Sequence, residues 1–241
     1  MNPVQPPQRP LKALSSMATK ALLKDLCGEF APSQAWPLEV ESTGGVDAAK
    51  RVAAGEAVDL VLLASDAIDR LMSAQQVMPH SRGDWVLSSV AMATPASAPR
   101  PDIHDEASLK AAVAAAPSIG YSTGPSGVYL EQLFARWGMS EAVKAKLVVP
   151  PPGTPVGALI ASGQVALGFQ QRSELIHLQG ITVLGDLPSD VAYTTIFSSA
   201  LGLSLAQDPQ RLAAAQAWQQ HLMSSATAEA KRRHGMQPVT P

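Results

Sequence analysis

The chain has 241 residues, of which 46% are hydrophobic and 16% are charged, and its net charge at pH 7 is -2. This composition is typical of a globular protein and excludes a disordered chain. It also speaks against nucleic-acid binding, because the basic stretch at 231–235 is short and ends a predicted helix, where it suits the helix dipole. The length fits one large domain or two lobes of about 100 to 130 residues each.

The cysteine and histidine content limits the possible cofactors. Cys27 is the single cysteine, which excludes an internal disulfide and a cysteine-based zinc site. The histidines, at positions 80, 104, 177, 221 and 234, show no HxxxH or HExxH spacing. We therefore expect neither a metal nor another cofactor.

The N-terminal stretch bears on location. Residues 1–14 contain prolines where a secretory signal has a basic start and an apolar segment. No apolar run is long enough to cross a membrane, so we expect no membrane insertion. As written, the chain is predicted to be cytoplasmic; a chain whose leader had been removed would show the same pattern and would be periplasmic.

Strands and helices alternate along the first part of the chain. The run at 58–64 is apolar throughout, which is typical of a parallel strand covered on both faces. The alternation predicts a parallel sheet with helices on both sides. The expected strands are 11–14, 38–43 and 58–64, and the expected helices are 17–30, a short one from Gly45 to about Gly55, and one from about Ser65.

A second block repeats this alternation with different spacing. Its predicted strands are 85–93, 118–122, 165–171, 180–188 and 193–201, and its predicted helices are 105–116, 127–138, 155–163, 208–223 and 226–234. A proline-rich stretch at 94–102 interrupts the first of these strands.

Small hydroxyl residues and glycines stand where several predicted strands run into helices. In a parallel sheet these junctions gather at the carboxyl edge, where ligands usually bind. Helix N-termini there offer unpaired N–H groups and partial positive charge, so hydroxyls beside them can hold an anion without lysine or arginine. Helix capping explains any single junction equally well. The junctions are Ser15-Ser16, Ser42-Thr43, and Ser122 through Ser126-Gly127.

The sequence gives only weak signs of nucleotide binding or of serine hydrolase activity. The segment GPSGVY at 124–129 does not match the phosphate-binding GxxxxGK[ST] pattern, and no GxGxxG follows the first strand. Ser126 lies one residue away from the GxSxG pattern of a serine hydrolase, and no acid and histidine can be assigned to complete a triad.

Four segments in this order resemble a known family: 14–26, 51–71, 126–139 and 155–176. They are similar to the extracytoplasmic solute-binding proteins related to the periplasmic molybdate-binding protein, and the likeness runs from about residue 11 to 238. It implies a type II periplasmic-binding-protein fold, in which two α/β lobes, each a mainly parallel sheet flanked by helices, hold a small ligand in their cleft. The implied lobes are 1–88 with 198–241, and 89–197, and the crossing strands lie near 88–92 and 194–199.

The resemblance also implies a set of ligand-binding residues. In the molybdate-binding relatives, hydroxyls and main-chain N–H groups from both lobes hold an oxyanion. For Arg172 a solvated surface charge is an equally good interpretation, although a guanidinium suits a carboxylate. The matching positions are Ser15, Ser16, Ser42, Thr43, Ser122, Ser126, Gly127, Tyr129, Pro155, Val156, Gln170, Gln171 and Arg172.

Two functions of different classes follow. The first is a solute-binding protein for a small oxyanion or carboxylate, with an ABC permease as partner if the protein is exported. The second is a cofactor-independent isomerase of a small polycarboxylate, because "SSM", "STGG" and "QQRSEL" look closer to a divergent branch that includes an aconitate isomerase. Isomerisation needs a base, for which Tyr129, Glu174 and His177 are the candidates.

Overall fold

The structure is a computed structural model that describes residues 9–30, 36–151 and 153–239. Residues 1–8, which belong to the N-terminal stretch used above to predict location, lie outside these ranges. The chain divides into two compact units. Unit 1 contains the described residues up to Val86, Ile196–Arg233 and those from Gln237 onward, and unit 2 contains Leu87–Thr195 and His234–Met236.

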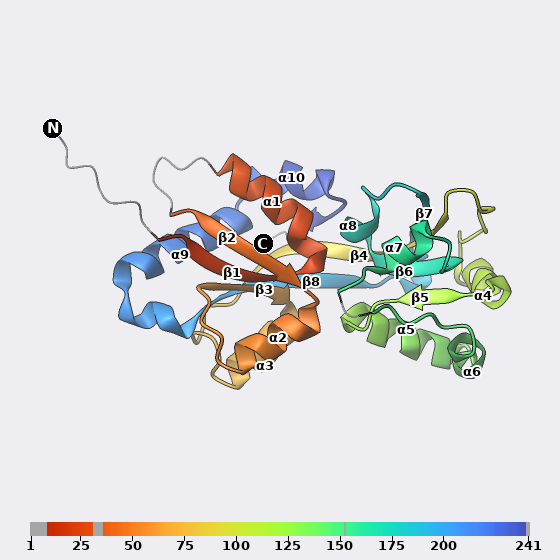
Figure 1. Cartoon of the computed structure of the whole chain (residues 1–241), viewed down its shortest axis with the longest axis horizontal. Helices are drawn as coiled ribbons and strands as arrows, with labels where there is room; N and C mark the ends of the chain where they lie inside the picture. Colours follow the sequence, from red (N-terminus) through yellow and green to blue (C-terminus); the bar gives the residue numbers. More distant parts are fainter. Residues whose placement is uncertain (1–8, 31–35, 152, 240–241) are drawn as a thin grey trace. The chain divides into compact units, whose positions relative to one another are not determined.

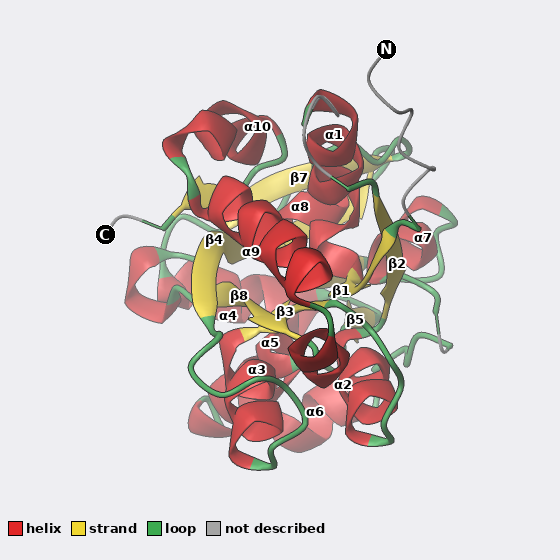
Figure 2. Ribbon diagram, turned by 90° about the vertical axis from the view of Figure 1, so that its left-hand side faces the viewer, coloured by secondary structure: helices red, strands yellow, loops and turns green. Residues whose placement is uncertain are grey.

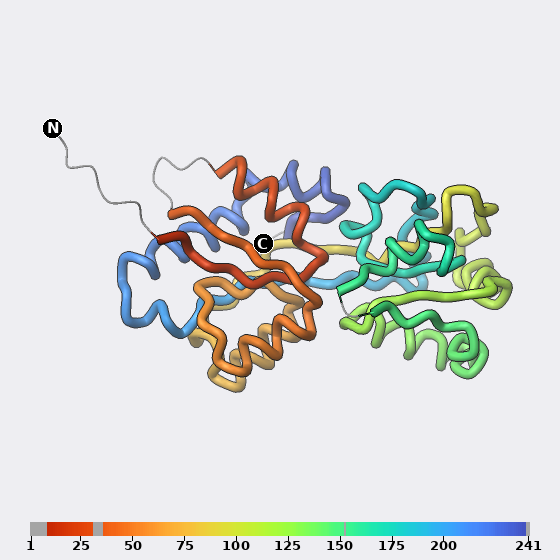
Figure 3. Tube along the Cα trace, in the orientation of Figure 1, coloured from red at the N-terminus to blue at the C-terminus, as the bar shows by residue number. Residues whose placement is uncertain are grey.

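The elements of unit 1 come from both ends of the chain. They are β1 (Leu11–Ser16), η1 (Met17–Thr19), α1 (Lys20–Glu29), β2 (Leu38–Thr43), α2 (Gly45–Ala53), β3 (Leu60–Ala64), α3 (Ser65–Ser73), η3 (Leu203–Gln207), α9 (Pro209–Met223), η4 (Ser225–Thr227), α10 (Ala228–Arg233) and β9 (Gln237–Pro238). Two long strands, β4 (Gly83–Pro95) and β8 (Thr194–Leu201), carry the chain out of unit 1 and back into it, as the trace in Figure 3 shows.

The sheet of unit 1 has the strand order β2-β1-β3-β8. β1 runs parallel to both β2 and β3, and β8 is antiparallel to β3. In Figures 1 and 2, α2 and α3 lie on one face of these strands and α1 and α10 on the other. Every residue of β3 is buried, as the apolar run in the sequence predicts for a strand covered on both faces.

Unit 2 has its own sheet, in which β5 (Ile119–Tyr121) and β6 (Leu167–Gln171) are parallel neighbours. β4 is antiparallel to β6 and to β7 (Ile181–Asp186). Its other elements are α4 (Glu106–Ala115), α5 (Pro125–Arg136), α6 (Ser140–Lys144), α7 (Val156–Ala161), α8 (Arg172–Leu175) and η2 (Ser189–Val191).

Alternate residues of β4 build the two cores of unit 2. Val90 and Met92 pack with side chains of α4, α5 and α6, whereas Ala91 and Ala93 pack with those of α7 and with Leu175. Figure 1 shows the corresponding arrangement, with α5 on one side of β5 and α7 on the other. The predicted α/β fold with helices on both faces of each sheet is confirmed, and the antiparallel members are the strands that pair with β4 or β8.

Candidate functional site

The first two hydroxyl junctions lie side by side in unit 1. β1 and β2 are parallel and in register, so that Ser15 pairs with Ser42 and Ser16 with Thr43. The Ser15 and Ser42 hydroxyls are 2.7 Å apart and hydrogen-bonded, and Ser15 is buried. Two strands therefore end in hydroxyl groups at the same edge of the sheet, which is the position where parallel α/β sheets bind ligands.

Helices begin directly after both strands. The Ser16 side chain caps η1 by accepting a hydrogen bond from the Ala18 N–H at 3.4 Å, a long contact. Gly44 precedes α2, and a Cβ placed on Gly45 would lie 3.6 Å from the Ser16 hydroxyl, so the two helix starts are close together. Asp47 lies in the first turn of α2 and adds a negative charge there. The hydroxyls of β1 and β2 are therefore the groups of this edge best suited to an anion.

The third junction lies at the start of α5 in unit 2. The Ser122 and Ser126 hydroxyls are 3.1 Å apart, and Ser126 is buried. Pro125 has no N–H to offer a ligand, and the Gly127 N–H donates to the Gly124 carbonyl at 2.9 Å. The Gly127 N–H is thus used within the turn, so the Ser122 and Ser126 hydroxyls remain as the predicted polar groups of this helix start.

Position 127 requires a glycine, because the backbone of another residue approaches it closely. A Cβ at this position would lie 1.7 Å from the Ser122 carbonyl oxygen, whereas one at Gly124 would meet nothing within 4 Å. We expect Gly127→Ala to lower the free energy of unfolding by about 1 to 3 kcal/mol or more, because backbone atoms must move. Gly124→Ala is the matched control in the same turn. Equal urea midpoints for the two variants would contradict this steric role.

A second group of predicted residues lies at the same edge of the unit 2 sheet. Tyr121, the last residue of β5, pairs with Phe169 of β6, so Ser122 directly after β5 and Gln170 in β6 each follow this pair. The buried Gln170 side chain accepts the Gly157 N–H at 2.8 Å and donates to Glu174 at 2.7 Å. The hydroxyls of the α5 start and the side chains after β6 therefore share one edge.

Pro155 and Val156 stand at the beginning of α7, beside this edge. Pro155 is the N-cap residue and Val156 is buried in the core between α7 and the sheet. Gly157 follows them, and its N–H is the donor that Gln170 accepts. In this segment Val156 therefore packs in the core, and the Gly157 N–H orients the Gln170 side chain.

Gln171 has a different environment from Gln170. Its side-chain N–H donates to the Thr195 hydroxyl at 2.7 Å, and both residues are buried. Its carbonyl oxygen has no hydrogen-bond partner among the described residues. Thr195, which the sequence did not single out, is therefore part of this polar group; its partner is 24 residues away in the chain, and no local pattern reveals the pairing.

Glu174 is an ionisable residue of this edge, and its pKa is unusual for a glutamate. Burial raises the pKa of its carboxyl group to about 7, while the hydrogen bond from Gln170 acts in the opposite direction. A carboxyl group with such a pKa is present in both protonation states near neutral pH. It can therefore accept a proton and return it without assistance from a cofactor.

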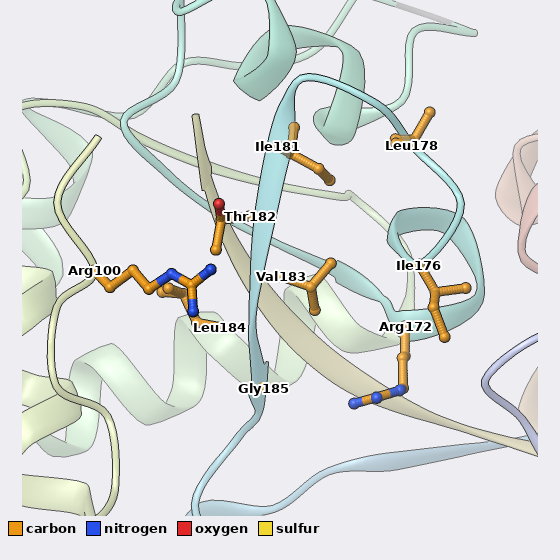
Figure 4. A pocket seen from close by; sticks show the side chains of 9 residues that line it. All are labelled: Arg100, Arg172, Ile176, Leu178, Ile181, Thr182, Val183, Leu184 and Gly185. Atoms are coloured by element: carbon orange, nitrogen blue, oxygen red, sulfur yellow. The ribbon is translucent and has the colours of Figure 1, made fainter. Parts of the chain in front are cut away.

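Arg172 is engaged elsewhere. Its guanidinium forms an ion pair with Asp186 at 2.9 Å, and the side chain lines a cavity of about 460 Å³ along β7. Figure 4 shows Arg172 and Arg100 with the β7 side chains Thr182 and Val183 and their neighbours. None of the predicted hydroxyl residues lines this cavity. The contact of Arg172 with Asp186 agrees better with the surface-charge interpretation than with a free carboxylate-binding group.

The other two candidate bases, Tyr129 and His177, have different surroundings. The Tyr129 hydroxyl donates to the Val191 carbonyl at 2.8 Å, its ring stacks on Tyr193 at 4.5 Å, and burial raises the pKa of the hydroxyl. His177 is exposed, and its ring packs edge-on against His234 at 5.1 Å. Tyr129 is therefore held as a protonated donor, and His177 lies at the surface.

Two further observations concern metals and membranes. Among the described residues, no group of three or more His, Cys, Asp or Glu side chains is placed to hold a metal ion. In the same part of the chain, no helix combines the length and the apolar character needed to cross a membrane.

Comparison with known proteins identifies relatives over most of the chain. The family model of bacterial extracellular solute-binding proteins matches residues 11–237. An aconitate isomerase from Pseudomonas sp is 39% identical over 190 residues, which cover 78% of this chain and 71% of the relative.

Solved structures share the fold at low sequence identity. The periplasmic molybdate-binding protein of Azotobacter vinelandii has a TM-score of 0.77 at 17% identity, covering 96% of this chain and 99% of that one. The sulfate-binding protein SubI from Mycobacterium tuberculosis H37Rv has a TM-score of 0.74 at 15% identity, covering 97% and 88%. At these identities the likeness establishes the two-lobed periplasmic-binding-protein fold.

Proposed function

Because the chain belongs to the bacterial extracellular solute-binding proteins, we propose that it binds a small anion through the hydroxyls at its strand-to-helix junctions. The hydrogen-bonded pairs Ser15–Ser42 and Ser122–Ser126 carry this proposal. Each pair lies where a strand ends or a helix begins, and the partial positive charge of a helix N-terminus favours negative charge there. The ligand class that we assign is a di- or tricarboxylate, which the aconitate isomerase relative supports.

A thermal-shift and calorimetry screen tests the ligand class. Citrate, cis-aconitate and trans-aconitate are compared with molybdate, tungstate and sulfate. A ligand at 100 times its dissociation constant raises the stability of the folded state by about 2.7 kcal/mol. Stabilisation by the tricarboxylates alone is the expected result. Stabilisation by the inorganic oxyanions alone would overturn the assignment of a carboxylate ligand.

Replacing one hydroxyl in each unit is expected to weaken binding of that ligand. Ser42→Ala and Ser126→Ala each remove a donor to a charged group, which costs about 1 to 3 kcal/mol. The dissociation constant then rises about 5- to 150-fold. The exposed serines Ser204 in unit 1 and Ser189 in unit 2 provide matched controls, whose replacement by Ala leaves the affinity unchanged. Unchanged affinity in Ser42→Ala and Ser126→Ala would mean that these hydroxyls serve helix capping and packing and do not bind the ligand.

A second function rests on the 39% identical relative, whose name states an isomerase activity. We propose that the bound polycarboxylate is isomerised by moving its carbon–carbon double bond. Such a reaction is a proton shift between two carbons and consumes no oxidant, reductant or co-substrate. Hydroxyl groups that hold a carboxylate also stabilise the enolate-like charge that develops on it when the proton leaves.

Proton NMR of cis-aconitate with the protein in deuterated water tests the isomerisation. Interconversion of the aconitate isomers with deuterium entering the carbon skeleton is the expected result. Binding of tricarboxylates without either change would assign the protein to solute binding alone.

A further inference from the structure

The proposed isomerisation requires a proton-transferring group, and Glu174 has the surroundings for it. Glu174 lies in α8, which begins directly after β6 at the sheet edge that Ser122 shares. Neither α7 nor β6 contributes an ionisable side chain to this region. β5 contributes Tyr121, the pKa of whose hydroxyl is raised chiefly by burial.

The cationic residue of α8 is already engaged in an ion pair. Arg172, on the same short helix, pairs with Asp186 at 2.9 Å. Apolar neighbours surround the start of α7, where a Cβ on Gly157 would meet Leu178 and Leu175. Burial disfavours the charged form of the Glu174 carboxyl group, and the hydrogen bond from the Gln170 amide favours it in part.

A chain of two hydrogen bonds orients this carboxyl group. The Gly157 N–H donates to the Gln170 carbonyl oxygen, which fixes the direction of the side-chain amide. The amide N–H of Gln170 must then point at Glu174, where it donates at 2.7 Å. One carboxylate oxygen of Glu174 is held in this way, and Gln170 is itself buried and cannot turn without losing both contacts.

We propose that Glu174 is the acid–base residue of this site and that Gln170 is its positioning residue. The assignment rests on the proposed isomerisation. The Glu174 carboxylate takes a proton from the saturated carbon beside the double bond of the bound polycarboxylate, and the C–H electron pair enters the conjugated system. The protonated carboxyl group then returns a proton to the far alkene carbon. One C–H bond breaks, one forms, the double bond moves by one carbon, and no electrons or protons are gained or lost.

Glu174→Gln is the decisive variant. It keeps the size and polarity of the side chain and removes the proton acceptor. The expected result is a turnover of aconitate at least 100-fold lower, in line with the usual contribution of an acid–base group. Calorimetry with trans-aconitate is expected to give a dissociation constant within about five-fold of the wild type, which also shows that the variant is folded. Glu141→Gln, at an exposed glutamate of α6, keeps full turnover as the control.

Gln170→Ala tests the positioning role by its pH profile. Since the hydrogen bond from Gln170 lowers the pKa of Glu174, its loss is expected to move the midpoint of the kcat profile upward and to lower kcat more than it changes KM. A purely structural role for Gln170 would leave the midpoint unchanged.

The outcomes separate the two proposals. A wild-type protein that neither interconverts the aconitates nor incorporates deuterium overturns the proposed isomerisation, and the role of Glu174 with it. A wild-type protein that does both, with Glu174→Gln retaining turnover within three-fold, overturns the assignment of Glu174 alone. Loss of tricarboxylate affinity in a folded Glu174→Gln variant would make Glu174 a binding residue and would equally overturn its acid–base role.

Discussion

Replacing Arg211 by Ala is expected to lower the free energy of unfolding by about 3 to 5 kcal/mol, because it leaves a buried carboxylate without its charge partner. The Arg211 guanidinium contacts both carboxylate oxygens of Asp59, at 2.8 and 2.5 Å. Their side chains are only 17% and 6% exposed, respectively. Asp59 also accepts the Lys12 N–H at 2.7 Å, so the pair connects α9 to the start of β1.

Urea unfolding of three variants measures this contribution. Arg70→Ala is the control, because Arg70 pairs with Asp66 on the exposed surface of α3 and such pairs contribute about 0.2 to 1 kcal/mol. The double variant Asp59→Asn with Arg211→Met removes both charges and is expected to lose less stability than Arg211→Ala alone. An Arg211→Ala variant as stable as Arg70→Ala would show that Asp59 is not dependent on its partner.

The elements predicted from the sequence are those with a strong repeating pattern. The apolar run that contains β3 and the helical spacing of Leu22, Leu23 and Leu26 in α1 correspond to buried faces. Hydrophobic periodicity reports burial directly, which is why it identifies such elements. α6 and α8 were missed, because helices of five and four residues are too short to show a period.

The lengths of β4 and β1 also differ from the prediction. β4 extends from Gly83 to Pro95, although its polar residues broke the apolar pattern. Ser15 and Ser16 belong to β1 rather than to the turn after it. Their pairing with Ser42 and Thr43 depends on strand register, and register is a property of the folded sheet that a single strand does not carry.

Some features of the candidate site could likewise be predicted from the sequence, and others could not. Hydroxyls at the ends of strands could be predicted, because parallel strands bring their carboxyl ends to one edge. The pairing of Gln170 with Glu174 and the pairing of Gln171 with Thr195 could not, since adjacent side chains of a strand face opposite sides and find their partners in the fold. The pKa of Glu174 likewise depends on its burial in the folded chain, which no local pattern in the sequence indicates.

The basic cluster at 231–233 has two different environments in the structure. Arg233 is partly exposed and pairs with Glu29 at 2.7 Å. Lys231 is buried, donates to the Leu222 carbonyl at 2.7 Å, and lies 6.0 Å from the centre of the Trp85 ring. Periodicity and charge alone do not distinguish these two residues, although one is buried and the other is paired at the surface.

The buried Lys231 is expected to make the stability of the protein depend on alkaline pH. Burial lowers the pKa of its ammonium group to about 8, from 10.5 in the unfolded chain. Below pH 8 both states carry the proton and the folded state bears the full cost of the buried charge. Between pH 8 and 10.5 the unfolded state holds more protons, so the free energy of unfolding rises with pH, by up to about 3 kcal/mol.

Lys231→Met removes this ionisable group while retaining an unbranched apolar side chain. Relative to Lys231→Met, the wild type is therefore expected to gain stability as the pH is raised from 8 to 10.5, measured by urea unfolding at each pH. Lys24→Met, at an exposed lysine of α1, corrects for a surface charge and is expected to follow the wild type throughout. Parallel curves for Lys231→Met and the wild type would mean that Lys231 keeps an ordinary pKa, with the Leu222 carbonyl and the Trp85 ring compensating fully for its burial.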